Sequence, residues 1–481
     1  MSLRRQAASG VAWTAISTIA TTVLQFGQLA ILARLLNPGD FGLMAMVMVV
    51  VGFANAFTDM GISNAIVHRQ DISRLQLSSL YWLNVFAGLV VAVFVIALSP
   101  MVAGFYQESR LIGLMGWAAL IFVIIPIGQQ FQMLLQKELH FQRLAQIEII
   151  SAIAGFGVSI IAAWYTQDVL ALIWGQLATA AVRSVLLAAI GWKTWQPSLQ
   201  FRWKEVQGFL SFGLYQMGER SINYFSWNMD KLLIGRILGS APLGFYNVAY
   251  QLMVRPFMVI NPIITKVAFP VFSSVQHDNE RLRRGILKMT QVIAFTNLPI
   301  YAGLFAVADP LMALLLGQGW EPAIAVFRVL VWLGALYSLS NPIGSLLLAK
   351  GRADIGFWFN VAALLIYAIA ILAGSQWGIV GIAVALLIAN LALLLPADIW
   401  VRWYLIRLSP LDYLAAILPF ALLSLAMMMG ILLVDHWLPP DLKFLRLLSA
   451  TMTGGVLYLG GVWMMQRAFL QELFMILKNR K

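Results

Sequence analysis

This chain of 481 residues is 61% hydrophobic, whereas only 11% of its residues are charged. Soluble domains carry roughly 25% charged residues, so the charges here are too few to cover a water-exposed surface of this size. A large soluble domain, a coiled coil and a disordered chain are therefore excluded. The net charge of +12 fits basic cytoplasmic loops and anionic lipid headgroups better than nucleic acid.

Apolar stretches of the length needed to cross a bilayer, about 20 residues, follow one another along the chain. The first is too long for the core of a signal peptide and is expected to remain as a helix. We predict an all-α, polytopic membrane protein with about 14 transmembrane helices. The predicted spans are residues 10–35, 41–66, 77–100, 111–135, 145–165, 168–190, 208–238, 242–274, 286–309, 322–348, 355–374, 377–400, 411–435 and 446–467.

The basic residues are distributed unequally between the two sides of these spans. With the N-terminus placed in the cytoplasm, 21 of the 32 Lys and Arg residues fall on the cytoplasmic side and 5 on the opposite side. Short cytoplasmic loops of membrane proteins are enriched in Lys and Arg, so we expect both termini in the cytoplasm. Since no loop reaches the size of a domain, the function is expected within the helices or at their ends.

Motifs of common active sites and metal sites are missing from the sequence. The chain has no cysteine, which excludes disulfides, thiolate metal ligands and a cysteine nucleophile. Its four histidines lack the spacing of metal ligands, and neither a Walker motif nor a serine-hydrolase motif is present. We therefore expect no enzymatic activity, no metal and no cofactor, and any transport has to be driven by something other than ATP.

The chain contains an internal repeat. Residues 31–42 match residues 233–244 at a constant offset of 202, with an Arg and a Gly in equivalent positions. A second match joins residues 125–137 to residues 341–350. Two halves of six helices related in this way would run parallel, as in transporters that alternate between two open states. Chance similarity between apolar helices is the alternative, and it weighs more for the second match.

The repeat predicts how the chain is organised. An N-terminal lobe is expected over residues 1–200 and would hold helices 1–6. A C-terminal lobe is expected over residues 201–408 and would hold helices 7–12. The remaining residues, 409–481, have no repeat partner, and they are predicted to form two extra helices and a cytoplasmic tail.

Four basic residues lie within two of the predicted spans. Arg220 and Lys231 are eleven residues apart on the seventh span, and Arg255 and Lys266 have the same separation on the eighth. Eleven residues bring a helix back to nearly the same direction. Charges at membrane depth cost about 2.5–3.5 kcal/mol each on insertion scales, so they usually face a cavity or a partner. We predict that these four residues line a wet lumen and bind an anionic group such as a phosphate.

Three acidic residues are candidates for binding a coupling cation. Glu219 and Asp230 lie on one polar face of the seventh span, and Asp59 lies in the second span beside a polar stripe. A structural interpretation remains open for each of them. Glu219 and Asp230 would then neutralise Arg220 and Lys231, and Asp59 would be an acid near the cytoplasmic end whose side chain reaches water.

Other polar features of the spans carry weaker predictions. Arg183 is expected to anchor the cytoplasmic end of the sixth span, whereas Glu148, Arg328 and Asp398 are single charges without an assigned partner. Prolines within helices kink or break them and often mark moving parts, although membrane bundles also tolerate such kinks. The prolines within predicted spans are Pro126, Pro262, Pro299 and Pro342.

Several short segments resemble a known family. They are residues 1–4 (MSLR), 81–85 (YWLNV), 128–131 (GQQF), 135–139 (LQKEL), 261–265 (NPIIT) and 341–347 (NPIGSLL). Together they resemble the Wzx-type polysaccharide flippases, and among these the chain is most similar to the colanic-acid exporter branch. The resemblance covers the first eleven predicted helices and is patchy in the last three.

The resemblance implies a fold and a function. The fold is that of the multidrug/oligosaccharidyl-lipid/polysaccharide exporter superfamily, with two six-helix lobes and two extra helices. The function is movement of undecaprenyl-diphosphate-linked oligosaccharide from the cytoplasmic to the outer leaflet of a bacterial inner membrane, for exopolysaccharide or lipopolysaccharide biosynthesis. We expect alternating access coupled to a cation gradient. The expected partners are the lipid-linked oligosaccharide, membrane lipid and a polysaccharide polymerase or export machinery, and no nucleic acid.

Two other functions compete with this one. The first is a cation-coupled drug or metabolite antiporter of the same superfamily, and the second is a membrane-bound glycan polymerase or ligase. An antiporter for cations would favour an acidic lumen, which the basic residues in the seventh and eighth spans disfavour. A polymerase or ligase usually carries its catalytic residues on a large external loop, and no loop of that size is predicted.

Overall fold

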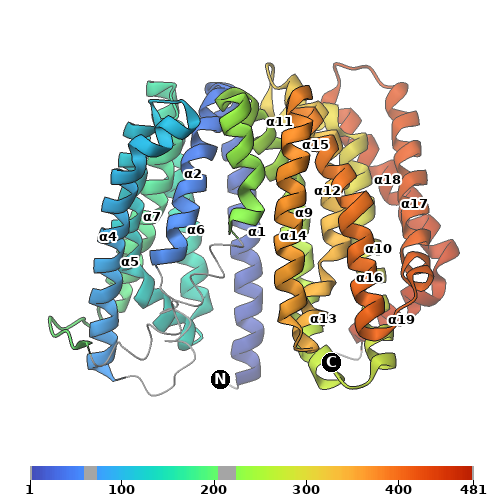
Figure 1. Cartoon of the computed structure of the whole chain (residues 1–481), viewed down its shortest axis with the longest axis horizontal. Coiled ribbons are helices and arrows are strands. Elements are labelled where there is room, and N and C mark those ends of the chain that lie inside the picture. The colour runs from blue at the N-terminus through green and yellow to red at the C-terminus, as the bar shows by residue number, and fades with distance from the viewer. Residues whose placement is uncertain (1–2, 59–72, 204–223, 479–481) are drawn as a thin grey trace. The chain divides into compact units, whose positions relative to one another are not determined.

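The computed structural model describes residues 3–58, 73–203 and 224–478 of the chain (Figure 1). These residues form helices joined by short connections, and no β-strand occurs among them. Twelve helical stretches in the described part are long and apolar enough to cross a membrane. The predicted class, an all-α polytopic membrane protein, is therefore confirmed, whereas the count of 14 spans stays a prediction.

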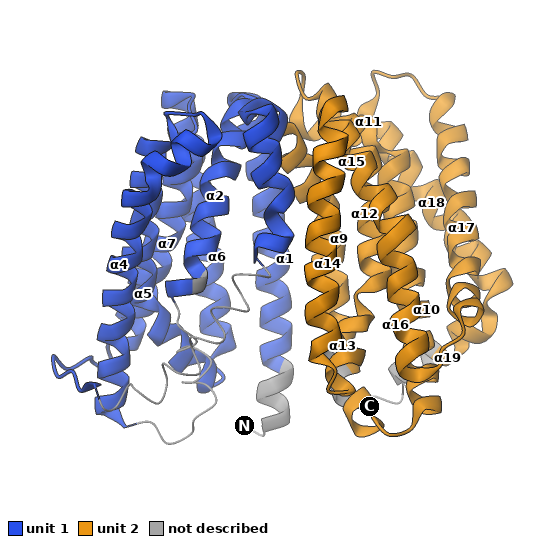
Figure 2. Cartoon of the chain, viewed as in Figure 1, with its two compact units in different colours: residues 1–244 blue, residues 245–481 orange. Residues whose placement is uncertain are grey.

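The chain divides into two compact units, Met1–Gly244 and Phe245–Lys481 (Figure 2). Each unit has its own apolar core. In the first, Leu80, Phe131 and Trp195 belong to one buried cluster, and in the second, Phe272 and Phe420 belong to another. The lobe boundaries expected after residues 200 and 408 stay predictions.

The first unit is a bundle of long helices. Within it α1 packs along α6, α6 along α7, and α5 along both α4 and α7. Residues 224–238 are also helical. The labelled helices of this unit are α1 (Leu3–Leu35), α2 (Pro38–Thr58), α4 (Arg74–Tyr106), α5 (Leu111–Lys137), α6 (Phe141–Thr166) and α7 (Leu170–Gly191), and α9 (Ser240–Ser274) begins in it.

Hydrogen bonds at the start of α4 explain why this helix begins earlier than predicted. The Ser73 hydroxyl accepts the Gln76 backbone N–H, and the Gln76 side-chain oxygen accepts the Ser73 backbone N–H, both at 3.1 Å. This reciprocal capping satisfies two backbone donors that a helix otherwise leaves free. The helix ends at Tyr106, because Gln107 adopts the left-handed conformation with φ of 58°.

The second unit contains the rest of α9 and the remaining helices. Here α10 packs along α17 and α12, and α17 packs along α18. The helices are α10 (Asn279–Ala306), α11 (Ala308–Leu316), α12 (Glu321–Ser340), α13 (Pro342–Ala349), α14 (Ala353–Gly374), the 3₁₀ turn η1 (Ser375–Trp377), α15 (Gly378–Ala389), the π-helical turn η2 (Asn390–Leu394), α16 (Leu395–Ile406), α17 (Pro410–His436), α18 (Lys443–Met465) and α19 (Arg467–Lys478).

The apolar stretch Ala353–Ile406, of 54 residues, folds back on itself at η1. The chain reverses at Gly378, which has φ of +70°, a conformation that favours glycine. The two arms, α14 and α15, then pack together. Their approach depends on two further glycines, because a Cβ atom on Gly374 would lie 2.6 Å from the carbonyl oxygen of Gly381.

A proline breaks one predicted span but not the equivalent one in the other half. The predicted span 322–348 is divided into α12 and α13 at Asn341, immediately before Pro342. Proline has no N–H, so the carbonyl of Ser338 loses its helical donor, and the side-chain Nδ2 of Asn261 donates to it instead, at 3.0 Å. By contrast, α5 continues through Pro126.

The repeated glycines Gly42 and Gly244 meet within the first unit. A Cβ atom on Gly42 would lie 1.7 Å from the carbonyl oxygen of Ser240, and one on Gly244 would lie 1.8 Å from that of Pro38. The first turns of α2 and α9 therefore touch through backbone atoms. Glycine in both copies of the repeat is required by this reciprocal contact.

Two helices were not expected from the sequence. Helix α11 is short, and α19 lies in the region predicted to be a cytoplasmic tail. Phe469 of α19 is buried against the rings of Phe295 and Phe420, at centroid distances of 5.5 and 5.1 Å. The C-terminal helix is thus part of the second unit's core.

Candidate functional site

The structure describes the side chains of three of the seven predicted site residues. Asp59, Glu219 and Arg220 lie outside the described residues. Lys266 lies on α9, but its side chain also falls outside the described part. The residues whose side chains are described are Asp230, Lys231 and Arg255.

Asp230 and Lys231 make hydrogen bonds along their own helix. The Asp230 carboxylate is buried and accepts the backbone N–H of Lys231 at 2.8 Å. The Lys231 Nζ donates to the side-chain oxygen of Asn228 at 3.0 Å, and the Asn228 amide donates to the Tyr224 carbonyl at 2.9 Å. These residues form a polar segment at the end of the first unit's chain.

Arg255 lies on α9 in the second unit, where its side chain is half-buried. Asn247 and Gln251, eight and four residues earlier, share its helix face. Lys231 belongs to one compact unit and Arg255 to the other. The single basic lumen predicted for them therefore stays a prediction.

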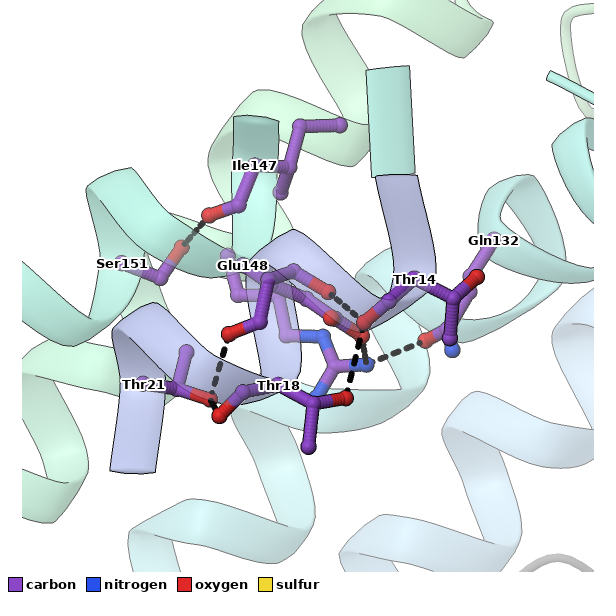
Figure 3. Close-up of polar contacts among 9 residues, drawn as sticks. Thr14, Thr18, Thr21, Gln132, Ile147, Glu148 and Ser151 are labelled. Carbon is purple, nitrogen blue, oxygen red and sulfur yellow. Dashed lines mark hydrogen bonds and ion pairs between the residues drawn. The ribbon is translucent and has the colours of Figure 1, made fainter. Parts of the chain in front are cut away.

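A polar cluster that was not predicted lies inside the first unit. Arg183 of α7 forms an ion pair with Glu148 of α6, with Nη2 and Oε1 3.6 Å apart. The same Nη2 donates to the side-chain oxygen of Gln132 on α5, at 3.1 Å. Three helices thus contribute one basic, one acidic and one amide side chain, which we call the Arg183 cluster (Figure 3).

Hydroxyl groups of α1 lie next to this cluster. Thr14, Thr18 and Thr21 are close to Glu148 (Figure 3), and α1 packs along α6. Each threonine donates its hydroxyl hydrogen to a backbone carbonyl four residues earlier in α1, at 2.7–2.8 Å. Their oxygen lone pairs remain as acceptors. Further along α1, the Gln28 amide donates to the Ser159 hydroxyl of α6 at 2.9 Å.

Small residues allow these polar side chains to sit between closely packed helices. A Cβ atom on Gly155 of α6 would lie 1.8 Å from the Thr179 hydroxyl oxygen of α7, and one on Gly175 would lie 2.6 Å from the Ser159 side chain. Small residues four positions apart are a common way for membrane helices to approach each other. The contact fixes the relative position of the helices that carry Glu148 and Arg183.

The Arg183 cluster is recessed yet accessible. Glu148 lies seven residues after the start of α6 at Phe141, which corresponds to about 10 Å of helix, and Arg183 lies about 12 Å before the end of α7. Their side chains are nevertheless 41% and 39% exposed. Arg183 therefore does not lie at the helix end, where the sequence placed it as an anchor. It presents a guanidinium to a polar, accessible surface inside the apolar bundle.

A different charged pair is fully enclosed in the second unit. Asp398 and Arg402 of α16 form an ion pair at 3.1 Å, and both side chains are only 1% exposed. The Arg402 guanidinium lies 4.4 Å from the ring centroid of Tyr413. Arg402 and the Tyr413 hydroxyl both donate to the Leu339 carbonyl, at 3.4 and 3.3 Å. This group holds the end of α12 next to its break and has no opening for a substrate.

Sequence spacing could have revealed one of these two groups. Asp398 and Arg402 are four residues apart, which places them side by side on a helix. Glu148 and Arg183 are 35 residues apart on different helices. Their pairing depends on how α6 packs on α7, and no local pattern indicates it.

Comparisons with known proteins identify the family. The model of the family described as "Polysaccharide biosynthesis protein" matches residues 31–325. The lipopolysaccharide biosynthesis protein WzxC of Escherichia coli (strain K12) is 39% identical over 392 residues, which cover 81% of this chain and 80% of WzxC. The chain belongs to the polysaccharide biosynthesis protein family.

Other relatives and structures agree with this assignment. The teichuronic acid biosynthesis protein TuaB of Bacillus subtilis (strain 168) is 37% identical over 427 residues, which cover 89% of this chain and 88% of TuaB. The lipid II flippase MurJ, in an inward closed conformation, superposes with a TM-score of 0.77 over 96% of this chain and 100% of MurJ, at 14% identity. The matched family thus confirms the resemblance to the Wzx-type polysaccharide flippases. The superposition on MurJ shows that the two proteins share a fold.

Proposed function

We propose that this protein is a flippase that moves undecaprenyl-diphosphate-linked oligosaccharide repeat units across a bacterial inner membrane, with both termini in the cytoplasm. The matched family and the names of its members support a role in polysaccharide biosynthesis. The fold shared with MurJ supports a transporter architecture. The product would pass to a polysaccharide polymerase or export machinery on the outer side.

The observation that carries this proposal is a polar, partly exposed arginine cluster within an apolar helical bundle. A flippase has to shield a charged diphosphate and a polar glycan from hydrocarbon while the lipid tail stays in the membrane. Arg183 offers a guanidinium fork suited to phosphate oxygens. The threonine oxygens of α1 and the amide of Gln132 offer hydrogen-bonding groups for sugar hydroxyls. No covalent step is needed, so the function is not enzymatic.

The proposal also includes the site residues that were predicted from the sequence. Basic side chains of the seventh and eighth predicted spans would bind the anionic group of the substrate. Acidic side chains would hold a cation when the substrate is absent. Glu148 is a new candidate of a different kind, because the diphosphate would displace its carboxylate from Arg183 and leave it free to take up a cation. The predicted basic residues are Arg220, Lys231, Arg255 and Lys266, and the predicted acidic residues are Asp59, Glu219 and Asp230.

A cellular experiment tests the proposal. The gene is deleted in its host, and the lipid-linked repeat units and the surface polysaccharide are measured. We expect surface polysaccharide to disappear and lipid-linked units to accumulate in the cytoplasmic leaflet, where a periplasmic glycosidase cannot reach them. Accumulation in the outer leaflet would contradict a flippase and favour a polymerase or ligase. Normal surface polysaccharide, with increased sensitivity to cationic drugs, would favour a drug antiporter.

A further inference from the structure

An apolar groove of about 1050 Å³ lies along α2 and α4 in the first unit. All fifteen described residues that line it are apolar, and seven of them are aromatic. Its wall on α4 runs from Trp82 to Leu98. At 1.5 Å per residue this is about 24 Å, most of the roughly 30 Å thickness of the hydrocarbon core. The groove is therefore long, lined by apolar residues throughout its described part, and parallel to a membrane-spanning helix.

The groove is open at its side. Phe86, Val90 and Phe94 line it and are 63%, 50% and 55% exposed. They lie on the apolar span Arg74–Tyr106, so the opening faces hydrocarbon. Among the described residues, a lipid chain can therefore enter the groove from the membrane along apolar side chains.

One end of the groove is formed by a segment that is firmly attached to the start of α4. Phe201 and Trp203 line this end. The Trp82 indole N–H donates to the Ser198 carbonyl at 2.9 Å, and the Arg202 backbone N–H donates to the Ser79 hydroxyl at 3.1 Å. These bonds hold the aromatic side chains at the level where α4 begins.

The same end carries positive charge. Arg74, Lys193 and Arg202 are exposed, and residues 73–82 and 192–203, all of them described, contain no acidic residue. The positive-inside pattern places this end at the cytoplasmic surface. A long apolar groove that ends at a basic, aromatic mouth is complementary to a molecule with a hydrocarbon tail and an anionic head.

We propose that this groove binds the polyisoprenoid tail of the lipid-linked substrate, with the diphosphate at Arg74, Lys193 and Arg202 before translocation. The inference rests on the proposed function and adds a separate binding site for the part of the substrate that never leaves the membrane. Aromatic walls suit the methyl-branched, unsaturated chain of an isoprenoid. The site would deliver the head group to the helical bundle with the tail already in place.

The first test measures how transport depends on tail length. Val90→Trp fills the groove from an exposed position, and Val93→Trp is the matched control, because Val93 is 59% exposed on the same helix and does not line the groove. Purified variants in proteoliposomes are supplied with substrates that carry either a full-length or a two-isoprene tail. We expect the wild type and Val93→Trp to show a KM about tenfold lower for the long tail.

Val90→Trp is expected to lose this preference, so that its KM for the long-tailed substrate rises to its KM for the short-tailed one. A folding defect would reduce transport of both substrates, so it is distinguishable from loss of the tail site. Retention of the full preference in Val90→Trp would overturn the proposal. If the wild type transports neither substrate, the proposed flippase function fails, and the second test still measures whether the groove is occupied.

The second test detects occupancy directly. A photoreactive amino acid replaces Phe94 in the groove or, as a control, Ile369 of α14, an exposed apolar residue of the second unit. We expect cross-links to radiolabelled polyisoprenyl-diphosphate saccharide at position 94, competed by polyisoprenyl diphosphate and not by phosphatidylglycerol. Absence of a cross-link, an equal yield at position 369, or equal competition by phosphatidylglycerol would overturn the proposal and identify the groove as a site for ordinary boundary lipid.

Discussion

Arg183 and Glu148 are held by packing rather than by local sequence, and both remain accessible. Their separation of 3.6 Å is long for an ion pair, and the Gln132 amide shares the guanidinium. Exposed ion pairs contribute about 0–1 kcal/mol to stability. The pair is therefore poorly explained as a stabilising element, and its geometry allows an incoming anion to replace the carboxylate.

Removal of the guanidinium should impair transport more than folding. We expect Arg183→Ala to raise the KM for lipid-linked oligosaccharide by about tenfold or more, because a charge-assisted bond to phosphate contributes about 1.5–3 kcal/mol. Arg183→Lys should recover part of the loss, since it keeps the charge without the fork. Arg284→Ala removes a comparable arginine, paired with Glu280 on the exposed surface, and should leave transport unchanged. Equal transport by Arg183→Ala and Arg284→Ala would exclude Arg183 from the site.

Glu108 and Arg110 form an ion pair outside the membrane-spanning helices, and this pair should make stability depend on pH. The Arg110 side chain donates to both carboxylate oxygens of Glu108, at 2.9 Å each, and this holds the pKa of Glu108 below its ordinary value. The pair therefore contributes stability above the unfolded pKa of about 4.3, and this contribution is lost as the pH falls through the lower folded value.

We expect Glu108→Gln to lower the thermal unfolding midpoint slightly at pH 7. The corresponding loss in the free energy of unfolding should be less than about 1 kcal/mol. Between pH 5 and pH 3 the variant should lose less stability than the wild type, because its side chain does not titrate. Melting curves of the detergent-solubilised protein at three pH values measure this difference. Parallel pH profiles for the two proteins would show that the pair contributes nothing.

At the scale of helices, the repeated glycines predict a tight contact that tolerates no side chain. Gly42→Ala places a methyl group 1.7 Å from the Ser240 carbonyl oxygen. Overpacking of this kind costs about 1–3 kcal/mol or more, so we expect a lower melting temperature and reduced expression. Gly116→Ala on α5 is the control, because nothing lies within 4 Å of the added Cβ atom there. It should be neutral or slightly stabilising. A Gly42→Ala variant as stable as Gly116→Ala would contradict the contact.

A helix was predictable from the sequence where local features of the sequence set its position. Apolar runs and basic loops indicated the spans, and the observed α14 and α17 begin within two residues of the predicted starts. The division at Pro342 was not predictable from the proline alone, since α5 continues through Pro126. It requires Asn261 of another helix to satisfy the freed carbonyl. The Arg183 cluster was missed for the same reason, because its members meet only through tertiary packing.

At the scale of the whole molecule, the sequence bears on which source of energy drives transport. The sequence lacks a nucleotide-binding motif, and we propose that directional flipping uses an ion gradient or removal of the product. We predict that an imposed proton or sodium gradient accelerates flipping in proteoliposomes and that ATP has no effect. Glu148→Gln should reduce the acceleration if its carboxylate carries the coupling cation. An unchanged rate after both gradients are collapsed would leave facilitated, downhill flipping and would remove the coupling role of the acids.

We propose that the protein itself translocates lipid-linked oligosaccharide. The most direct measurement uses purified protein in liposomes that contain undecaprenyl-diphosphate oligosaccharide in both leaflets. An added glycosidase or lectin that cannot cross the membrane reports how fast the inner-leaflet pool becomes accessible. We predict that the wild type exposes the whole pool with an imposed cation gradient, whereas Arg183→Ala does so at least about tenfold more slowly. Access limited to the outer leaflet, at the rate of protein-free liposomes, would contradict the account.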